Sequence, residues 1–91
     1  MVRRRASQAV REIRQRVQEG RVLAKKEMNE DELDDLDVLL IILHGTLVAR
    51  QTHGARGTRY VFGGRAADRE DVEVVCRLVD SEVRIITAYR L

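Results

Sequence analysis

The residues of this 91-residue chain that could do chemistry are arginine, lysine, tyrosine and histidine. They suit a metal-independent ribonuclease, because Arg and Lys stabilise a pentacoordinate phosphate while Tyr, His or Lys moves the proton of a ribose hydroxyl. They equally suit plain phosphate binding, so the residue types leave both hypotheses open. The candidate catalytic residues are Tyr89, Arg77, Arg84, Lys25, Lys26 and His53.

Other chemistries have weaker support in the sequence. Two histidines and one cysteine at unrelated positions make no recurring ligand spacing, so neither a metal nor another cofactor is expected. The pair Gly63-Gly64 resembles a turn more than a phosphate loop. Cys76 lies at an apolar position of a strand-like run, which favours a buried filler over a nucleophile. His44 is expected at a helix end, and His53 is more often a solvated turn residue than an acid or base.

Length and composition indicate one folded domain over residues 1–91, with residues 1–6 as a flexible basic start. Hydrophobic residues make up 44% and charged residues 35%, which is ordinary for a globular domain. The longest uncharged run, residues 38–49, is shorter than the ~20 residues that span a bilayer. With one cysteine and no signal-like segment, we expect a cytoplasmic protein without a membrane anchor.

The net charge of +2 hides opposite blocks along the chain. Residues 1–26 carry +7, residues 27–37 carry −7, and the remainder carries +2. Such blocks neutralise each other within a fold, mediate self-association, or leave a basic face for a polyanion. The arginines of the polar face of the first helix are the candidates for that basic face: Arg11, Arg14 and Arg16.

Two or three helices are predicted in the first half of the chain. Val10, Ile13 and Val17 have helical spacing, which predicts an amphipathic helix over residues 8–19 that ends at Gly20. A short helix is favoured over a strand for residues 22–28. Asn29 and Glu32 form a capping pattern for the next helix, which should end before Gly45. Its expected buried face consists of Leu33, Leu36, Leu40 and Leu43.

Four strands are predicted in the second half, over residues 46–51, 58–62, 72–79 and 83–89. Their short connections imply antiparallel neighbours in sequential order. The predicted fold class is therefore α+β, with two or three N-terminal helices packed on a four-stranded antiparallel meander.

Alternation predicts the two faces of this sheet. The helix-facing residues should include Val74, Cys76, Ile85 and Thr87. The other face should present Arg59, Arg77, Arg84 and Arg90, with Arg77 and Arg84 side by side, although arginines often only cover such a face with their stems. The residues predicted to contact nucleic acid are Arg11, Arg14, Arg16, Arg59, Arg65 and Arg90.

The chain resembles the domain-of-unknown-function family 4258, which is placed near RelE-like and MqsR-like RNA-cleaving toxins. The segments that carry the likeness are DVLLIILHG (37–45), YVFGGR (60–65), VEVVCR (72–77) and VRIITAY (83–89). The resemblance implies a RelE-like fold, RNA as the substrate, an antitoxin protein as a partner, and a functional tyrosine at Tyr89. Closure of the core is the more ordinary role for that tyrosine.

One departure from the family pattern concerns the helix before the acidic segment. Members often carry a His-Ala pair there, whereas residues 23–28 read LAKKEM. Either Lys25 or Lys26 substitutes for the histidine, or activity is lost. The leading hypothesis is a toxin-like RNA-binding domain, in its active form a metal-independent endoribonuclease. The rival is a non-catalytic interaction module that binds a protein partner, or itself as a homodimer, through its charge-polarised helices.

Overall fold

The computed structural model describes residues 6–24, 33–52, 54 and 57–91 of the protein. The predicted roles of Lys25, Lys26 and His53, and the predicted cap at Asn29, lie outside these residues.

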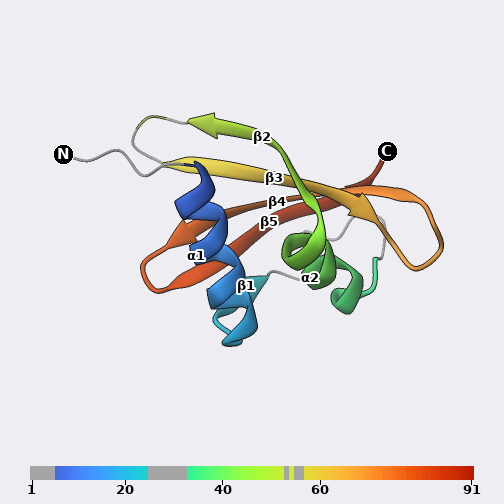
Figure 1. Ribbon diagram of the computed structural model, residues 1–91, viewed down its shortest axis with the longest axis horizontal. Coiled ribbons are helices and arrows are strands. Elements are labelled where there is room, and N and C mark those ends of the chain that lie inside the picture. Colours follow the sequence, from blue (N-terminus) through green and yellow to red (C-terminus); the bar gives the residue numbers. More distant parts are fainter. Residues whose placement is uncertain (1–5, 25–32, 53, 55–56) are drawn as a thin grey trace.

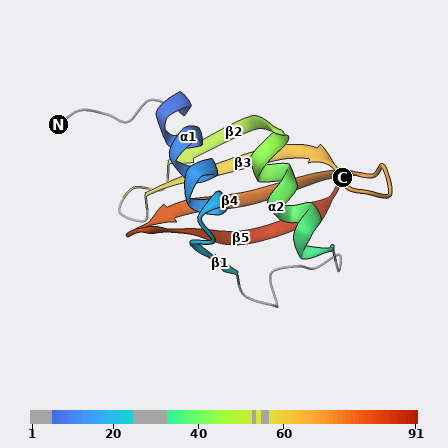
Figure 2. The ribbon, with the colours of Figure 1, turned by 60° about the horizontal axis from the view of Figure 1, so that its bottom comes forward.

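The described residues form two helices and a five-stranded mixed sheet, which confirms the α+β class (Figure 1). Both helices lie on the same face of the sheet (Figure 2). The strand order is β1-β5-β4-β3-β2. The element bounds are α1 (Ala6–Gln18), β1 (Val22–Ala24), α2 (Asp35–His44), β2 (Thr46–Thr52), β3 (Thr58–Arg65), β4 (Asp71–Val79) and β5 (Glu82–Arg90).

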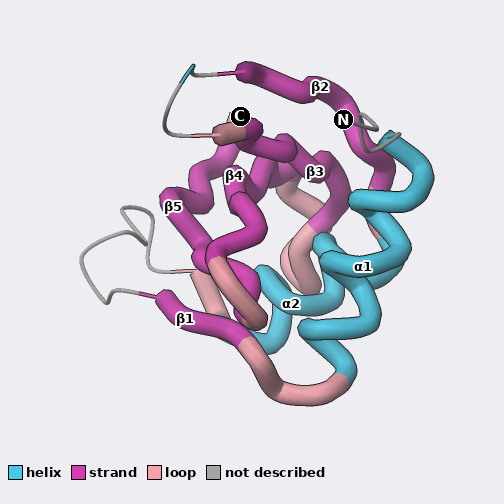
Figure 3. Tube along the Cα trace, turned by 90° about the vertical axis from the view of Figure 1, so that its left-hand side faces the viewer, coloured by secondary structure: helices cyan, strands magenta, loops and turns pink. Residues whose placement is uncertain are grey.

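The predicted antiparallel meander is confirmed for β2 to β5, but the sheet has an additional strand. β1 pairs with β5 in parallel, with Val22 opposite Val83, and forms one edge of the sheet (Figure 3). The expectation of a short helix from Val22 is therefore wrong for β1. The Val83 amide donates to the Arg21 carbonyl at 2.9 Å, so the chain leaving α1 runs directly onto the edge of β5. This pairing outweighs the helix propensity of the segment.

The end of α1 follows its sequence signal. Gly20 has a φ of 76°. The Gly20 amide donates to the Val17 carbonyl at 3.0 Å, and the Arg21 amide donates to the Arg16 carbonyl at 2.9 Å. These two bonds are those of a Schellman motif, in which a left-handed residue closes the last turn. The turn directs the chain back toward the sheet.

The predicted buried face of the second helix is half right, because Leu33 is buried and Leu43 packs against the core, but the other two leucines are exposed. Leu36 and Leu40 are 62% and 40% exposed, whereas the residues turned into the core are Val38, Ile41 and Ile42. The helix begins after Asp34, whose side chain accepts from the Leu36 amide at 2.8 Å. Because residues 38–43 are apolar around the whole helix, their pattern did not select one face, and packing against the sheet did.

A close backbone approach joins α2 to the sheet at Gly45. The Gly45 amide donates to the Ile41 carbonyl at 2.8 Å. A Cβ at this position would collide with the carbonyl oxygens of Ile41 and Gly63. The expected turn at Gly63-Gly64 is wrong, because both glycines lie within β3. A Cβ on Gly64 would come within 3.2 Å of the Ile41 side chain, so a glycine here lets the helix approach the strand.

A register shift in the last strand pair decides which side chains share a face. Val75 lies opposite Thr87, whereas the next residue, Cys76, lies opposite Ile85. Ile86 is the extra residue of this β-bulge. As a result Ala88, at 2% exposure, takes the position facing the helices. The expectation that Thr87 faces the helices is wrong, whereas Ile85 does face them.

The core lies between the helices and the sheet and is made mainly of aliphatic side chains around Phe62. Cys76 is fully buried there, and burial raises the pKa of its thiol to about 12. This confirms the expected packing role, because a thiol that holds its proton at neutral pH is inert as a nucleophile. Within the described part of the chain, no helix is long and apolar enough to cross a membrane.

Candidate nucleic-acid interface

The face of the sheet opposite the helices, called here the open face, carries most of the candidate site. The register places residues of the three central strands on it. They are Arg59, Val61, Gly63 and Arg65 of β3, Asp71, Glu73, Val75, Arg77 and Val79 of β4, and Glu82, Arg84, Thr87 and Tyr89 of β5.

Three arginines lie side by side across the open face. Arg77 is opposite Arg84, and the pairing of Tyr60 with Cys76 places Arg59 next to Arg77 on the other side. We call these residues the arginine row. All three are half-buried. Like charges directly opposite each other destabilise a strand pair, so this arrangement favours binding of an anion.

Two buried valines lie beside the arginine row. Val61 and Val75 are opposite each other in β3 and β4, and they are only 4% and 7% exposed. Neither belongs to the core under the helices. Longer side chains of the open face therefore cover them, as arginine stems do on exposed sheets.

Tyr89 and Glu73 form a hydrogen-bonded pair on the same face. They are opposite each other in β5 and β4, and the Tyr89 hydroxyl donates to Glu73 Oε1 at 2.6 Å. This hydrogen bond, with burial and the negative charge of Glu73 as smaller causes, raises the pKa of Tyr89. The phenol is therefore a donor that keeps its proton rather than a base. Glu73 Oε1 is the acceptor in this hydrogen bond.

Glu73 was not among the residues predicted from the sequence. Simple alternation placed Tyr89 on the helix-facing side with Val83 and Ile85, away from Glu73. The β-bulge at Ile86 brings Tyr89 to the open face with the arginine row. No feature of residues 83–89 identifies that bulge in advance, because the segment reads as a regular strand.

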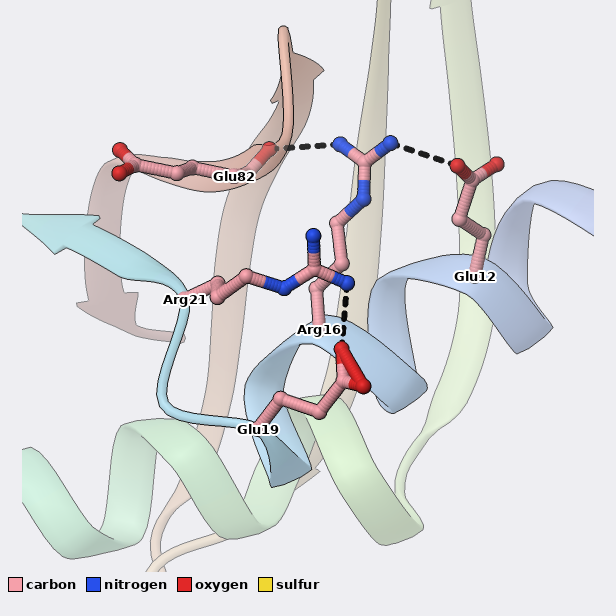
Figure 4. Close-up of polar contacts among 5 residues, drawn as sticks. All are labelled: Glu12, Arg16, Glu19, Arg21 and Glu82. Carbon is pink, nitrogen blue, oxygen red and sulfur yellow. Dashed lines mark hydrogen bonds and ion pairs between the residues drawn. The ribbon is translucent and has the colours of Figure 1, made fainter.

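The arginines of α1 do not share one solvent-exposed face as expected. Arg16 is only 8% exposed. Its guanidinium donates to the Glu82 carbonyl at 2.9 Å and to Glu12 at 2.6 Å, while Arg21 pairs with Glu19 nearby (Figure 4). Arg16 thus fixes α1 to the turn between β4 and β5. The expectation of an exposed Arg16 is wrong, because its side chain satisfies a carbonyl inside the fold.

Arg14 is also used by the fold. Its Nε donates to the Ile42 carbonyl at 3.0 Å and its Nη2 to the Gly45 carbonyl at 2.7 Å. The guanidinium carbon lies 5.7 Å from the centre of the Phe62 ring. A cation at the C-terminus of α2 also meets the negative end of the helix dipole. Of the three predicted helix arginines, Arg11 is the exposed one.

The remaining predicted arginines lie apart from the arginine row. Arg65 is exposed and pairs with Asp71 at 3.5 Å at the far end of β3. Arg90 pairs with Asp68 at 3.2 Å. The expectation that Arg90 lies on the open face is wrong, because its register partner is the buried Val72 of the helix-facing side. Among the described residues, no three His, Cys, Asp or Glu side chains come together as a group that would hold a metal ion.

The comparisons with known proteins identify a family. The model of the family described as Domain of unknown function (DUF4258) matches residues 24–90. The match covers α2 and the strands β2 to β5, and therefore all of the open face. No curated protein and no solved structure matches the chain. The structure defines an α+β domain whose open sheet face carries a row of three arginines. The chain belongs to the DUF4258 family.

Proposed function

We propose that this protein is a toxin-like RNA-binding domain that cleaves RNA without a metal ion. The observation that carries the proposal is the β-bulge at Ile86, which gathers the arginine row and the Tyr89–Glu73 pair on one uncovered face. The likeness to RelE-type and MqsR-type toxins is part of the proposal, as are an antitoxin partner and action in the cytoplasm.

The binding step rests on charge and shape. Arg59, Arg77 and Arg84 come from three adjacent strands, so their guanidinium groups form a line across the sheet. This line matches the phosphates of an RNA strand that lies over the sheet. Tyr89 is the only aromatic residue that the register places on the open face among the described residues. With few platforms for base stacking, binding rests on the backbone and tolerates many sequences.

The cleavage step uses the same face, on which Glu73 lies four residues from Arg77 along β4. The Glu73 carboxylate takes the proton of a ribose 2′-hydroxyl, and the 2′-oxygen forms a bond to the adjacent phosphorus. The bond from phosphorus to the 5′-oxygen breaks, and this oxygen takes a proton from water. The products are a 2′,3′-cyclic phosphate and a 5′-hydroxyl. The arginine row stabilises the charge on the pentacoordinate phosphate, and Tyr89 holds the carboxylate in place.

RNA binding is tested by anisotropy of an unstructured, labelled RNA at several salt concentrations. Arg84→Gln should weaken binding for all sequences and lower the salt slope by about 0.7, the value for one phosphate contact of a single strand. The matched control is Arg69→Gln, because Arg69 is exposed in the loop between β3 and β4. An equal loss in both variants, or none in Arg84→Gln, contradicts the proposed interface.

Cleavage is tested separately with Glu73→Gln and Tyr89→Phe. We expect Glu73→Gln to slow cleavage by about 10²-fold or more at unchanged affinity, which is the usual size of a general-base effect. Tyr89→Phe should cause a smaller loss, because the base remains but its orienting hydrogen bond is gone. An RNA with 2′-deoxyriboses should bind and stay intact. Wild-type protein that binds RNA but leaves it intact would restrict the function to binding.

A protein-interaction module is the second candidate, and the surface of α2 favours it. Leu36 and Leu40 are exposed, lie one helical turn apart and follow the acidic residues Asp34 and Asp35. Exposed leucines next to carboxylates suit a partner helix with an apolar stripe and basic flanks. Dimerisation of the isolated protein that is insensitive to salt, together with no RNA affinity, would favour this candidate over the first.

A further inference from the structure

A second basic site lies on the other side of the sheet, where an open groove runs between α1 and the start of β2. Its volume is ≈ 1030 Å³, at the upper end of the range for small-molecule sites. The groove is lined by Ser7, Val10, Arg11, Arg14, Gln15, Gln18, Gly45, Thr46 and Leu47. None of these residues belongs to the arginine row or to the Tyr89–Glu73 pair, so the groove is separate from the interface proposed above.

The polar wall of the groove has the chemistry of an anion site. Arg11 is exposed, and Arg14 is held in place by the carbonyls of Ile42 and Gly45. A guanidinium has five N–H donors, so the two bonds of Arg14 leave donors for a ligand. Among the described residues that line the groove there is no carboxylate to neutralise these two charges. A fixed guanidinium also loses little entropy when a ligand binds.

The rest of the groove fits a larger ligand than a bare ion. Val10 and Leu47 supply an apolar floor, and the amides of Gln15 and Gln18 supply neutral donors and acceptors. A nucleoside monophosphate combines these properties, because its phosphate matches the arginine forks and its sugar and base have apolar faces. The described lining contains no aromatic residue, so base stacking is weak and discrimination between bases should be slight.

We propose that the groove between α1 and β2 is a binding site for a nucleoside monophosphate, either free or as the terminal nucleotide of an RNA. The arginines bind the phosphate, and the apolar floor takes the nucleoside. An acidic peptide offers carboxylates to the same arginines but no nucleoside, so a phosphate ligand is preferred over it.

The site is tested by NMR titration of the intact protein with adenosine 5′-monophosphate. The amide signals of Gln15 and Leu47 should shift, and uridine 5′-monophosphate should give a similar affinity. Inorganic phosphate should bind more weakly than the nucleotide, and adenosine should cause no shifts over the same range of ligand concentration. Hexaglutamate that binds as tightly as the nucleotide would overturn the proposal in favour of an acidic protein partner. An oligonucleotide with a 5′-phosphate, compared with the unphosphorylated one, shows whether the RNA terminus also binds.

Arg11→Gln should weaken nucleotide binding at least tenfold, because it removes one of two charge-assisted contacts. Arg69→Gln is again the control for a lost surface charge. Arg11→Lys should recover part of the affinity, since the charge is kept and only the fork is lost. Unchanged affinity in Arg11→Gln would overturn the proposal. Arg84→Gln should leave nucleotide binding intact while it weakens RNA binding at the open face, so the two proposals fail or stand separately.

Discussion

The two faces of the sheet bury apolar side chains in different ways. Beneath the helices, Phe62, Val74 and Cys76 are fully buried by other apolar groups. On the open face, their neighbours in the same strands, Val61 and Val75, are nearly as buried although neither α1 nor α2 covers them. Half-buried side chains of the same face, such as Arg77 and Arg84, do this covering with their stems. A strand can therefore be buried on both faces while one face still presents charge for binding.

The largest expected effect breaks the packing on the covered face. Phe62→Ala should cost about 3–5 kcal/mol of unfolding free energy, because it leaves a cavity among residues that are held on all sides. Val61→Ala, at the adjacent position of the open face, should cost about 1–2 kcal/mol, because flexible side chains close over a smaller void. Denaturant titrations of the two variants measure the difference. Equal losses would show that the open face is packed like a core.

An intermediate effect is expected from alkaline pH. The thiol pKa of Cys76 is about 12 in the fold and 9.0 in a model thiol, so the folded state keeps a proton that the unfolded chain loses. The buried thiol therefore contributes to the free energy of unfolding. This contribution is complete below pH 9 and is lost as pH rises from 9 toward 12, by about 1.4 kcal/mol per pH unit. Cys76→Ala should therefore show a flatter fall in stability between pH 9 and 10.5.

Tyr89 provides the open-face counterpart of this measurement. Its pKa is also raised, mainly by the hydrogen bond to Glu73, so Tyr89→Phe should also flatten the alkaline fall in stability, but to a smaller extent. The reason is that its phenol lies near solvent, which screens the charge of the phenolate. A steeper effect for Tyr89 than for Cys76 would contradict the contrast between the two faces.

The smallest effect concerns the arginine row in the absence of ligand. Arg84→Gln removes one of two directly opposed charges in β4 and β5, so it should raise stability by a few tenths of a kcal/mol at low salt. Added inorganic phosphate should raise the melting temperature of the wild type more than that of the variant. Arg84→Gln that is clearly less stable than the wild type would show that Arg84 packs the face rather than repelling its neighbour.

The sequence by itself determined the elements that depend on local signals. Alternating apolar residues and short connections correctly predicted the antiparallel meander from Thr46 to Arg90. Gly20 and Gly45 correctly marked the ends of α1 and α2, because each position has a backbone requirement that glycine meets. The side-by-side placement of Arg77 and Arg84 also followed from strand pairing alone. Each of these features depends on residues within one or two neighbouring elements.

Tertiary structure alone decided what depends on contacts between distant elements. It buried Arg16 against the Glu82 carbonyl and directed Arg14 to the end of α2. Contact with the sheet also selected Ile41 and Ile42 over Leu40 as the buried residues of an apolar helix. The bulge at Ile86 moved Tyr89 to the open face, because packing buried Ala88 and shifted the register of everything after it. The proposed site exists only through that shift, since alternation alone keeps Tyr89 and Glu73 on opposite faces.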